Sequence, residues 1–281
     1  MFSKYNKKWL VVILSLALII PLILSACAKE TSPDTTSTLS GTITEAGSTT
    51  VQPLAEQLRD AFQVIYPKVT VTIQGGGTAV GIKSAQDGTV DIGAASRSLT
   101  DAEKTGLVTT VIARDGIAVI VNPAQKNISN LTKVQVQDIF SGKITNWKDL
   151  GGDNKEIVLV SREEGSGTRT AFQDLILGKD VMIADTAILQ SSNGAIRTII
   201  TSNPYAITYL SFGYIDTEVK ALSLEGVPAT IDNARNGTYP AVRPLLFLTK
   251  TQPTGLVKTF IDFCLSDEGQ AIVAKDYITV K

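Results

Sequence analysis

Short apolar segments alternate with amphipathic segments along most of the chain. Residues 42–46 and 69–73 have the apolar and β-branched character of strands. Between them, apolar residues recur at helical spacing from Val51 to Ile65. Further strands are predicted at residues 90–94, 107–113, 117–121, 157–160, 206–210 and 245–248, and further helices at 80–86, 134–140, 170–177, 194–202, 256–265 and 267–275. This alternation predicts an α/β fold with crossover helices.

The first 27 residues have a different pattern. A short basic region with Lys4, Lys7 and Lys8 precedes an apolar run over residues 9–23, and small residues follow it. This order is typical of a secretory signal peptide, which we predict at residues 1–26. The end of the segment, Leu24-Ser25-Ala26-Cys27, resembles the lipobox of bacterial lipoproteins, in which the cysteine after the cleavage site carries a diacylglycerol. An uncleaved membrane anchor is the alternative, and in both cases the remaining chain faces outward.

Residues 28–40 are polar, rich in Ser and Thr, and lack apolar periodicity. Together with a lipidated Cys27 they predict a flexible tether over 27–40, with the folded body beginning at Gly41. The expected location is therefore the outer face of the cell membrane, with Cys27 as the lipid anchor.

The charge and the rare residue types exclude several function classes. Removal of residues 1–26 takes away three basic residues and no acidic one, so the net charge becomes −4, with 23 basic against 27 acidic residues. A mildly acidic chain argues against nucleic acid as a partner. The chain has no histidine, which is the commonest general base and transition-metal ligand, and we predict no metal and no cofactor. Cys264 lies in an apolar segment and is expected to be a small buried residue.

Three segments combine glycine with Ser or Thr between a predicted strand and a predicted helix. They are Gly47-Ser48-Thr49-Thr50, Gly75-Gly76-Gly77-Thr78 and Gly165-Ser166-Gly167-Thr168. Glycine lets the backbone approach a ligand closely, and a helix start offers free N–H donors. The hydroxyls add neutral donors, although each of them has an alternative role as a helix N-cap. Together the loops predict a set of donors around a small tetrahedral anion.

Arg162 precedes the third loop, and its planar guanidinium suits two oxygens of one anion. Pairing with Glu163 or Glu164 at the surface is the alternative. Enzymatic motifs fail at the same loops. Ile82 interrupts the Gly-Lys-Ser/Thr sequence that a phosphate-binding P-loop needs. No histidine is present to activate Ser166 as a nucleophile, so we predict no enzyme, with an exported serine hydrolase as the alternative from a different class.

From about Leu39 to its C-terminus, the chain resembles the phosphate-binding lipoproteins of ABC-type phosphate importers, the PstS-like family. The most specific matches are the loop Arg162–Thr168 and the C-terminal segment 260–270. Other matching segments are Gly47-Ser48-Thr49, residues 75–78, Thr89-Val90-Asp91-Ile92-Gly93-Ala94, residues 139–144 with Trp147, and Asn236-Gly237-Thr238-Tyr239-Pro240.

The resemblance implies an anion site formed by six residues. In it, Thr49 and Thr78 donate hydroxyls, Arg162 forms the charged fork, and Ser166, Gly167 and Thr168 supply backbone and hydroxyl donors. Possible additional members are Ser48, Thr50, Ser96 and Arg97.

Arg97 departs from the family pattern, because well-known members have an aspartate there that accepts the proton of phosphate and thereby rejects sulfate. An arginine cannot accept a hydrogen bond. Arg97 is then either a second anion donor or a partner of Asp91 in a structural ion pair. This departure keeps another tetrahedral oxyanion, such as sulfate, as an alternative ligand.

The family also implies a two-lobed, type II periplasmic-binding-protein-like fold with a ligand cleft between the lobes and two hinge crossings. We expect lobe I at residues 41–119 and 241–281 and lobe II at 120–240, with the crossings near 118–122 and 239–245. The implied function is capture of inorganic phosphate by a monomer and its delivery to the permease of a membrane ABC importer. A surface signalling protein with the same fold remains an alternative.

Overall fold

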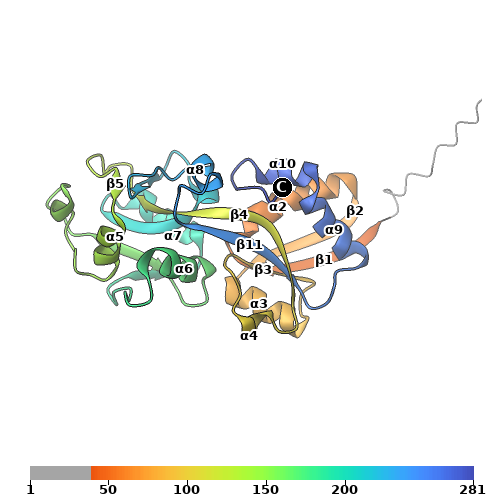
Figure 1. The fold of residues 1–281 in the computed structure, drawn as a ribbon. Coiled ribbons are helices and arrows are strands. Elements are labelled where there is room, and N and C mark those ends of the chain that lie inside the picture. Colours follow the sequence, from red (N-terminus) through yellow and green to blue (C-terminus); the bar gives the residue numbers. More distant parts are fainter. Residues whose placement is uncertain (1–38) are drawn as a thin grey trace, which may run out of the picture. The chain divides into compact units, whose positions relative to one another are not determined.

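A computed structural model describes residues 39–281 (Figure 1). The predicted signal peptide, the lipidated Cys27 and nearly all of the tether lie outside the described residues. Within residues 39–281, no helix is long and apolar enough to cross a membrane. The main sheet has the strand order β2-β1-β3-β11-β4-β8-β6-β7, and β9 (Lys220–Ala221) pairs with β4.

The first half of this sheet lies in the part of the chain expected to form lobe I. Strands β1 (Ser40–Gly47), β2 (Lys68–Gly75) and β3 (Ile92–Ala95) are parallel, as expected for strands joined by crossover helices. The helices of this lobe are α2 (Gln52–Ile65), α3 (Thr78–Asp87), α4 (Asp101–Lys104), α9 (Gly255–Leu265) and α10 (Asp267–Val273).

The apolar face of α2 forms much of the lobe I core. Leu54, Leu58 and Phe62 recur at helical spacing and are fully buried. The ring centroids of Phe62 and of Phe260 from α9 lie 5.1 Å apart. Cys264 is buried in the same cluster, as predicted, and burial raises the pKa of its thiol.

The second half of the sheet lies in the part of the chain expected to form lobe II. Here β6 (Val158–Arg162) lies between β7 (Ile188–Gln190) and β8 (Ala206–Ser211), parallel to both. Aromatic residues fill the core, and the rings of Phe172 and Tyr209 stack at 4.0 Å. The α-helices are α5 (Lys133–Phe140), α6 (Gly167–Phe172) with its π-helical continuation η4 (Gln173–Leu177), α7 (Asn193–Ser202) and α8 (Ile231–Arg235). The short 3-10 helices are η3 (Trp147–Leu150) and η5 (Phe212–Tyr214). A separate small sheet pairs β5 (Asn130–Leu131) with β10 (Ser223–Leu224).

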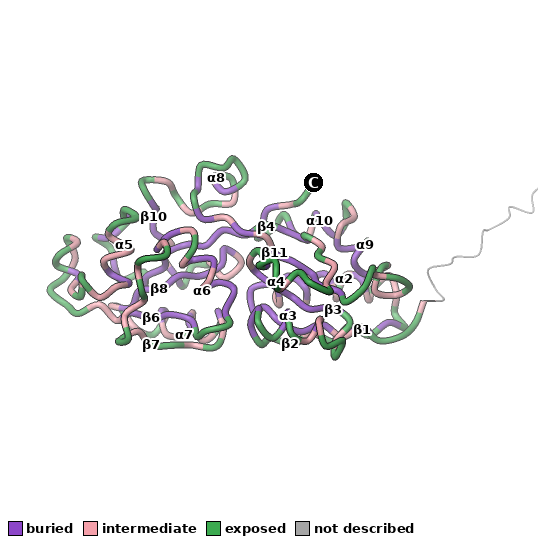
Figure 2. Tube along the Cα trace, turned by 60° about the horizontal axis from the view of Figure 1, so that its bottom comes forward, coloured by how far each residue is buried: buried purple, intermediate pink, exposed green. Residues whose placement is uncertain are grey.

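Two long strands connect the lobes, β4 (Val108–Val121) and β11 (Val242–Thr249) (Figure 1). The first part of β4 pairs with β11 as far as Gly116, and from Ile117 onward it pairs with β8. The change of partner precedes the range 118–122 predicted for the first crossing, whereas β11 begins inside the range predicted for the second. In the burial view, β4 is buried where it passes between the two halves of the sheet, whereas buried and half-buried residues alternate at the start of β11 (Figure 2).

The predicted break between strands 107–113 and 117–121 is wrong, because β4 is continuous. Residues 114–116 interrupt the apolar pattern between the two predicted strands, but Asp115 is paired inside the protein. The other predicted strands and helices are confirmed to within a few residues. The short elements β5, β7, β9, β10, α4 and α8 were not predicted.

Candidate anion-binding site

All three predicted loops connect the carboxyl end of a strand to the start of a helix. The first joins β1 to α2, the second joins β2 to α3, and the third joins β6 to α6. In the first loop, a side chain at Gly47 would place its Cβ 2.3 Å from the carbonyl oxygen of Ala94, so only glycine fits there. The predicted strand–loop–helix arrangement is confirmed for each loop.

The loops of the two lobes contact each other directly. The hydroxyls of Thr50 in lobe I and Thr168 in lobe II lie 3.0 Å apart. The backbone N–H of Ala79 donates to the carbonyl of Gly165 at 3.1 Å. The structure therefore brings together the three loops that the sequence suggested separately.

The predicted hydroxyl residues are buried, and most of them are not helix caps. Thr49 and Thr78 are buried, and neither is the capping residue of α2 or α3, which begin after Val51 and Gly77. Ser96 is also buried, and its backbone N–H donates to Oγ1 of Thr78 at 3.1 Å. Among the hydroxyl residues predicted as anion ligands, Ser166 does act as a helix N-cap. Its Oγ accepts from the N–H of Arg169 at 3.2 Å.

The third loop also offers backbone donors. The N–H groups of Gly167 and Thr168 stand in the first turn of α6 and have no acceptor among residues 39–281. Both residues are buried. A buried N–H group is normally paired, so these two donors suit an acceptor that comes from outside the chain.

Arg162 carries the charge of the site. It is only 2% exposed, and it forms no ion pair with any residue of 39–281. Its Nε donates to the carbonyl of Gln190 at 3.2 Å and its Nη2 to that of Ser191 at 2.8 Å, which leaves Nη1 without a partner in the described part of the chain. Burial lowers the pKa of Arg162, but a guanidinium remains protonated in proteins. The alternative of a surface pair with Glu163 or Glu164 is wrong.

A second buried arginine, Arg243, was missed by the sequence analysis. It pairs with Asp115, and its Nη2 donates to Thr50 Oγ1 at 3.2 Å. Its Nη1 donates to the carbonyl of Ser96 at 3.1 Å. Arg243 therefore holds two loops of lobe I from its position on β11.

A fourth loop, Ser191-Ser192 before α7, was missed too. Asn193 at the start of α7 is fully buried and donates from Nδ2 to the hydroxyls of Thr49 and Thr50 at 3.1 and 3.0 Å. Its sequence context, serines and a glycine between a strand and a helix, matches the three predicted loops and is the signal that could have indicated it. Nearby, the hydroxyl of Tyr214 donates to the carbonyl of Thr49 at 2.7 Å.

Arg97 lies in an ion pair, but its expected partner was wrong. Its Nη1 and Nη2 donate to the two carboxylate oxygens of Glu103 at 2.7 and 2.8 Å. This contact lowers the pKa of Glu103 to about 2. Asp91 instead accepts from the N–H and hydroxyl of Thr44. The helix α4 that presents Glu103 was not predicted, which explains why the partner was misassigned.

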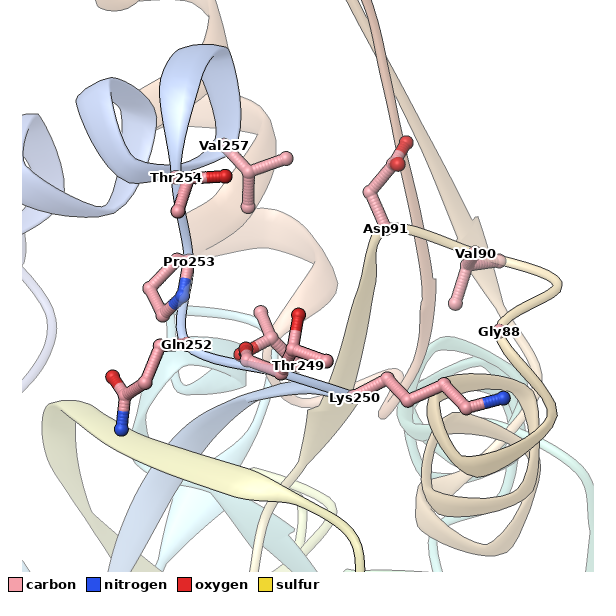
Figure 3. Close-up of a pocket in the computed structure, with 10 residues that line it drawn as sticks. Gly88, Val90, Asp91, Thr249, Lys250, Gln252, Pro253, Thr254 and Val257 are labelled. Carbon is pink, nitrogen blue, oxygen red and sulfur yellow. The ribbon is translucent and has the colours of Figure 1, made fainter.

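A cavity of about 250 Å³ lies elsewhere in lobe I, between the amino end of β3 and the carboxyl end of β11 (Figure 3). Asp91 and Lys250 are the charged residues that line it. None of the predicted anion-binding residues lines this cavity. The loops at the carboxyl ends of β1, β2 and β6 therefore remain the candidate site.

Comparison with known proteins agrees with this architecture. The model of the PBP superfamily domain matches residues 32–268. The phosphate-binding protein PstS of Bacillus subtilis (strain 168) is 35% identical over 86% of this chain and 81% of its own length. The chain belongs to the PBP superfamily and, within it, to the PstS family.

Solved structures support the family and the two-lobed fold. A candidate phosphate ABC transporter substrate-binding protein from Clostridium perfringens, solved with bound phosphate, is 43% identical to this chain with a TM-score of 0.83. The match covers 86% of this PstS-family chain and 100% of that one. An ABC-type phosphate transport receptor from Vibrio cholerae is 36% identical with a TM-score of 0.69, over 84% and 99% of the two chains.

Proposed function

We propose that this protein captures inorganic phosphate between its two lobes and delivers it to an ABC importer in the membrane. The observation that carries the proposal is Arg162, a buried cation without a carboxylate partner among residues 39–281. An isolated buried charge is costly, and an anion in contact with Nη1 would compensate it. The assignment of phosphate as the anion is supported by the relatives whose names and titles mention it.

In this proposal, the predicted residues act as anion ligands. Arg162 supplies the charge, and Thr49, Thr78 and Thr168 supply hydroxyl hydrogens. Gly167 and Thr168 supply backbone N–H groups that have no acceptor in the described chain. The Ser166 hydroxyl already accepts from Arg169, which leaves its own hydrogen available to the anion.

Closure of the lobes is the signal to the importer. The anion contacts residues of both lobes in the closed state alone, and it therefore favours that state. We assign lobe I to residues 41–119 and 241–281 and lobe II to 120–240. The hinge lies where β4 exchanges β11 for β8, at Gly116 and Ile117. No catalytic step is part of this function.

The location follows from the proposed lipid anchor. We assign residues 1–26 to a signal peptide and Cys27 to a diacylglycerol, with the folded body a monomer on the outer face of the cell membrane. Metabolic labelling with a radioactive fatty acid tests this assignment, because Cys27→Ala should remove the label. Label that persists in this variant would place the lipid elsewhere.

Phosphate uptake by cells tests the transport role. Deletion of the gene should abolish high-affinity phosphate uptake, and the wild-type gene should restore it. Restoration by Arg162→Ala would contradict the proposed site. Unchanged phosphate uptake together with lost sulfate uptake would identify the ligand as sulfate, and loss of neither would favour a signalling role.

A further inference from the structure

Asn193 has a buried oxygen for which the protein provides no hydrogen bond. The side-chain amide is fully buried against the first loop of the site. Its Nδ2 has two acceptors, the hydroxyls of Thr49 and Thr50. Its Oδ1 has no partner within residues 39–281. A buried polar atom without a partner is rare and costly, so this oxygen calls for a donor.

The hydroxyl network shows which atoms remain available. Thr50 Oγ1 receives hydrogens from Arg243 Nη2 and Asn193 Nδ2, which fill its two lone pairs. Its own hydrogen then points to Thr168 Oγ1, 3.0 Å away. Thr49 Oγ1 accepts from Nδ2 and, at 3.5 Å, from the N–H of Asn193. The hydrogens of Thr49 and Thr168 are therefore free to reach a ligand.

The opposite orientation of the amide would remove these donors. If Oδ1 faced the two threonines, Thr49 and Thr50 would give their hydrogens to Asn193. Thr168 would then give its hydrogen to Thr50. The orientation seen here keeps two hydroxyl donors and leaves one fixed acceptor, Oδ1.

Two other acceptors near the loops, the carboxylate of Asp115 and the carbonyl of Thr49, already have partners. In Asp115, Oδ1 accepts from the hydroxyl of Ser211 and the N–H of Phe212, and Oδ2 accepts from Arg243. The carbonyl of Thr49 accepts from Tyr214. A free hydroxyl can rotate to donate or accept and so does not discriminate between ligands. The oxygen of an amide can only accept.

We propose that Asn193 determines the specificity of the site by detecting a proton on the anion. A P–OH or As–OH group donates a hydrogen bond to Oδ1. A tetrahedral dianion without a proton would place an oxygen against Oδ1, with two acceptors facing each other. The acceptor is neutral, so it rejects unprotonated anions without adding negative charge to the site. This inference rests on the proposed function, the capture of phosphate.

Monofluorophosphate is the probe that isolates this proton. At pH 8 it is a dianion of nearly the size and charge of hydrogen phosphate, but fluorine replaces the hydroxyl and it has no proton to donate. The purified protein, stripped of bound anion by unfolding and refolding, is titrated by calorimetry with phosphate, arsenate, monofluorophosphate and sulfate. We expect phosphate and arsenate to bind about 10- to 100-fold more tightly than the two unprotonated anions.

Variants of Asn193 assign the effect to the residue. In Asn193→Ala, the preference for phosphate over monofluorophosphate should fall by about 10-fold or more. Asn193→Asp retains an acceptor and should keep the preference, although its charge weakens the binding of all four anions. Asn127→Ala changes an exposed asparagine of the same lobe and should leave every affinity unchanged.

Several results would overturn the proposal. Equal binding of monofluorophosphate and phosphate by the wild-type protein would do so without any variant. An equal loss for all four anions in Asn193→Ala would mean that Asn193 merely positions Thr49 and Thr50. No binding of phosphate or arsenate by the wild-type protein would instead refute the proposed function, and this inference with it.

Discussion

The guanidinium of Arg243 and the carboxylate of Asp115 form a buried ion pair between the two strands that join the lobes. Nη2 and Nε of Arg243 lie 2.9 and 3.1 Å from Oδ2 of Asp115, and the two side chains are 1% and 0% exposed. The negative charge of Asp115 compensates the positive charge of Arg243. The uncompensated positive charge of the site therefore resides on Arg162, which pairs with no carboxylate in the described chain.

Removal of one partner from the Asp115–Arg243 ion pair, called the hinge pair below, should lower the stability of the protein. Asp115→Asn leaves the Arg243 charge buried without compensation and should lower the free energy of unfolding by about 3–5 kcal/mol. Urea denaturation measures this change. The matched control is Asp216→Asn, which breaks an exposed pair with Arg197 and should cost at most about 1 kcal/mol. Equal costs for the two variants would show that burial does not strengthen the hinge pair.

Arg162→Ala should weaken phosphate binding by about 2–5 kcal/mol, because a desolvated anion would lose its charged donor. Arg162→Lys should restore part of the loss, since it keeps the charge but not the fork. Arg235→Ala removes an exposed arginine of the same lobe and serves as the control. Calorimetry measures all three variants. An affinity for phosphate that survives in Arg162→Ala would place the anion away from this residue.

Gly167→Ala separates closure from folding. The added Cβ would lie 2.2 Å from Oγ1 of Thr78 and 2.7 Å from Oγ of Ser96, both in the opposite lobe. The clash exists only when the lobes are closed, so the melting temperature without anion should stay near that of the wild type. Phosphate affinity should fall by about 1–3 kcal/mol or more. Small-angle X-ray scattering with phosphate should show a protein that remains open, and a normal closed form would contradict the assignment.

Ser166 caps α6, and two measurements can separate this role from its proposed role as an anion ligand. Ser166→Ala removes the cap of α6 and should lower the free energy of unfolding by about 0.5–2 kcal/mol. It should also weaken phosphate binding by about 1–3 kcal/mol. Thr132→Ala removes the cap of α5, whose capping box makes it the matched control for stability without an effect on binding. If Ser166→Ala behaves like Thr132→Ala, Ser166 is a cap and not a ligand.

Glu45 should make stability depend on pH. Its side chain is buried in lobe I, and burial, with a smaller effect of Glu56, raises its pKa to about 8. The folded state then holds a proton that the unfolded chain releases near pH 4.5. The contribution of this proton to the free energy of unfolding is complete below about pH 4.5 and is lost as the pH rises to about 8. The free energy of unfolding should fall over this range with a slope of at most about 1.4 kcal/mol per pH unit.

Glu45→Gln should remove this slope from urea denaturation curves recorded between pH 5 and 8. The control is Glu268→Gln, which changes an exposed carboxylate of the same lobe and should leave the slope in place. The same slope in Glu45→Gln and in the wild type would mean that another group titrates in this range.

The sequence predicted the three anion loops because a strand, a glycine-hydroxyl segment and a helix start are each local patterns. It could not reveal that Asp115 and Arg243 meet, because a buried ion pair between strands distant in sequence has no local signature. Asn193 was missed for a related reason. Its role depends on contacts with Thr49 and Thr50, which lie more than 140 residues earlier in the chain.

Titration calorimetry of the anion-free protein with phosphate tests directly whether the protein captures this anion. We expect saturable binding of one phosphate per chain, with affinity that falls sharply in Arg162→Ala. Binding of sulfate in place of phosphate, or of neither anion, would contradict the proposed function.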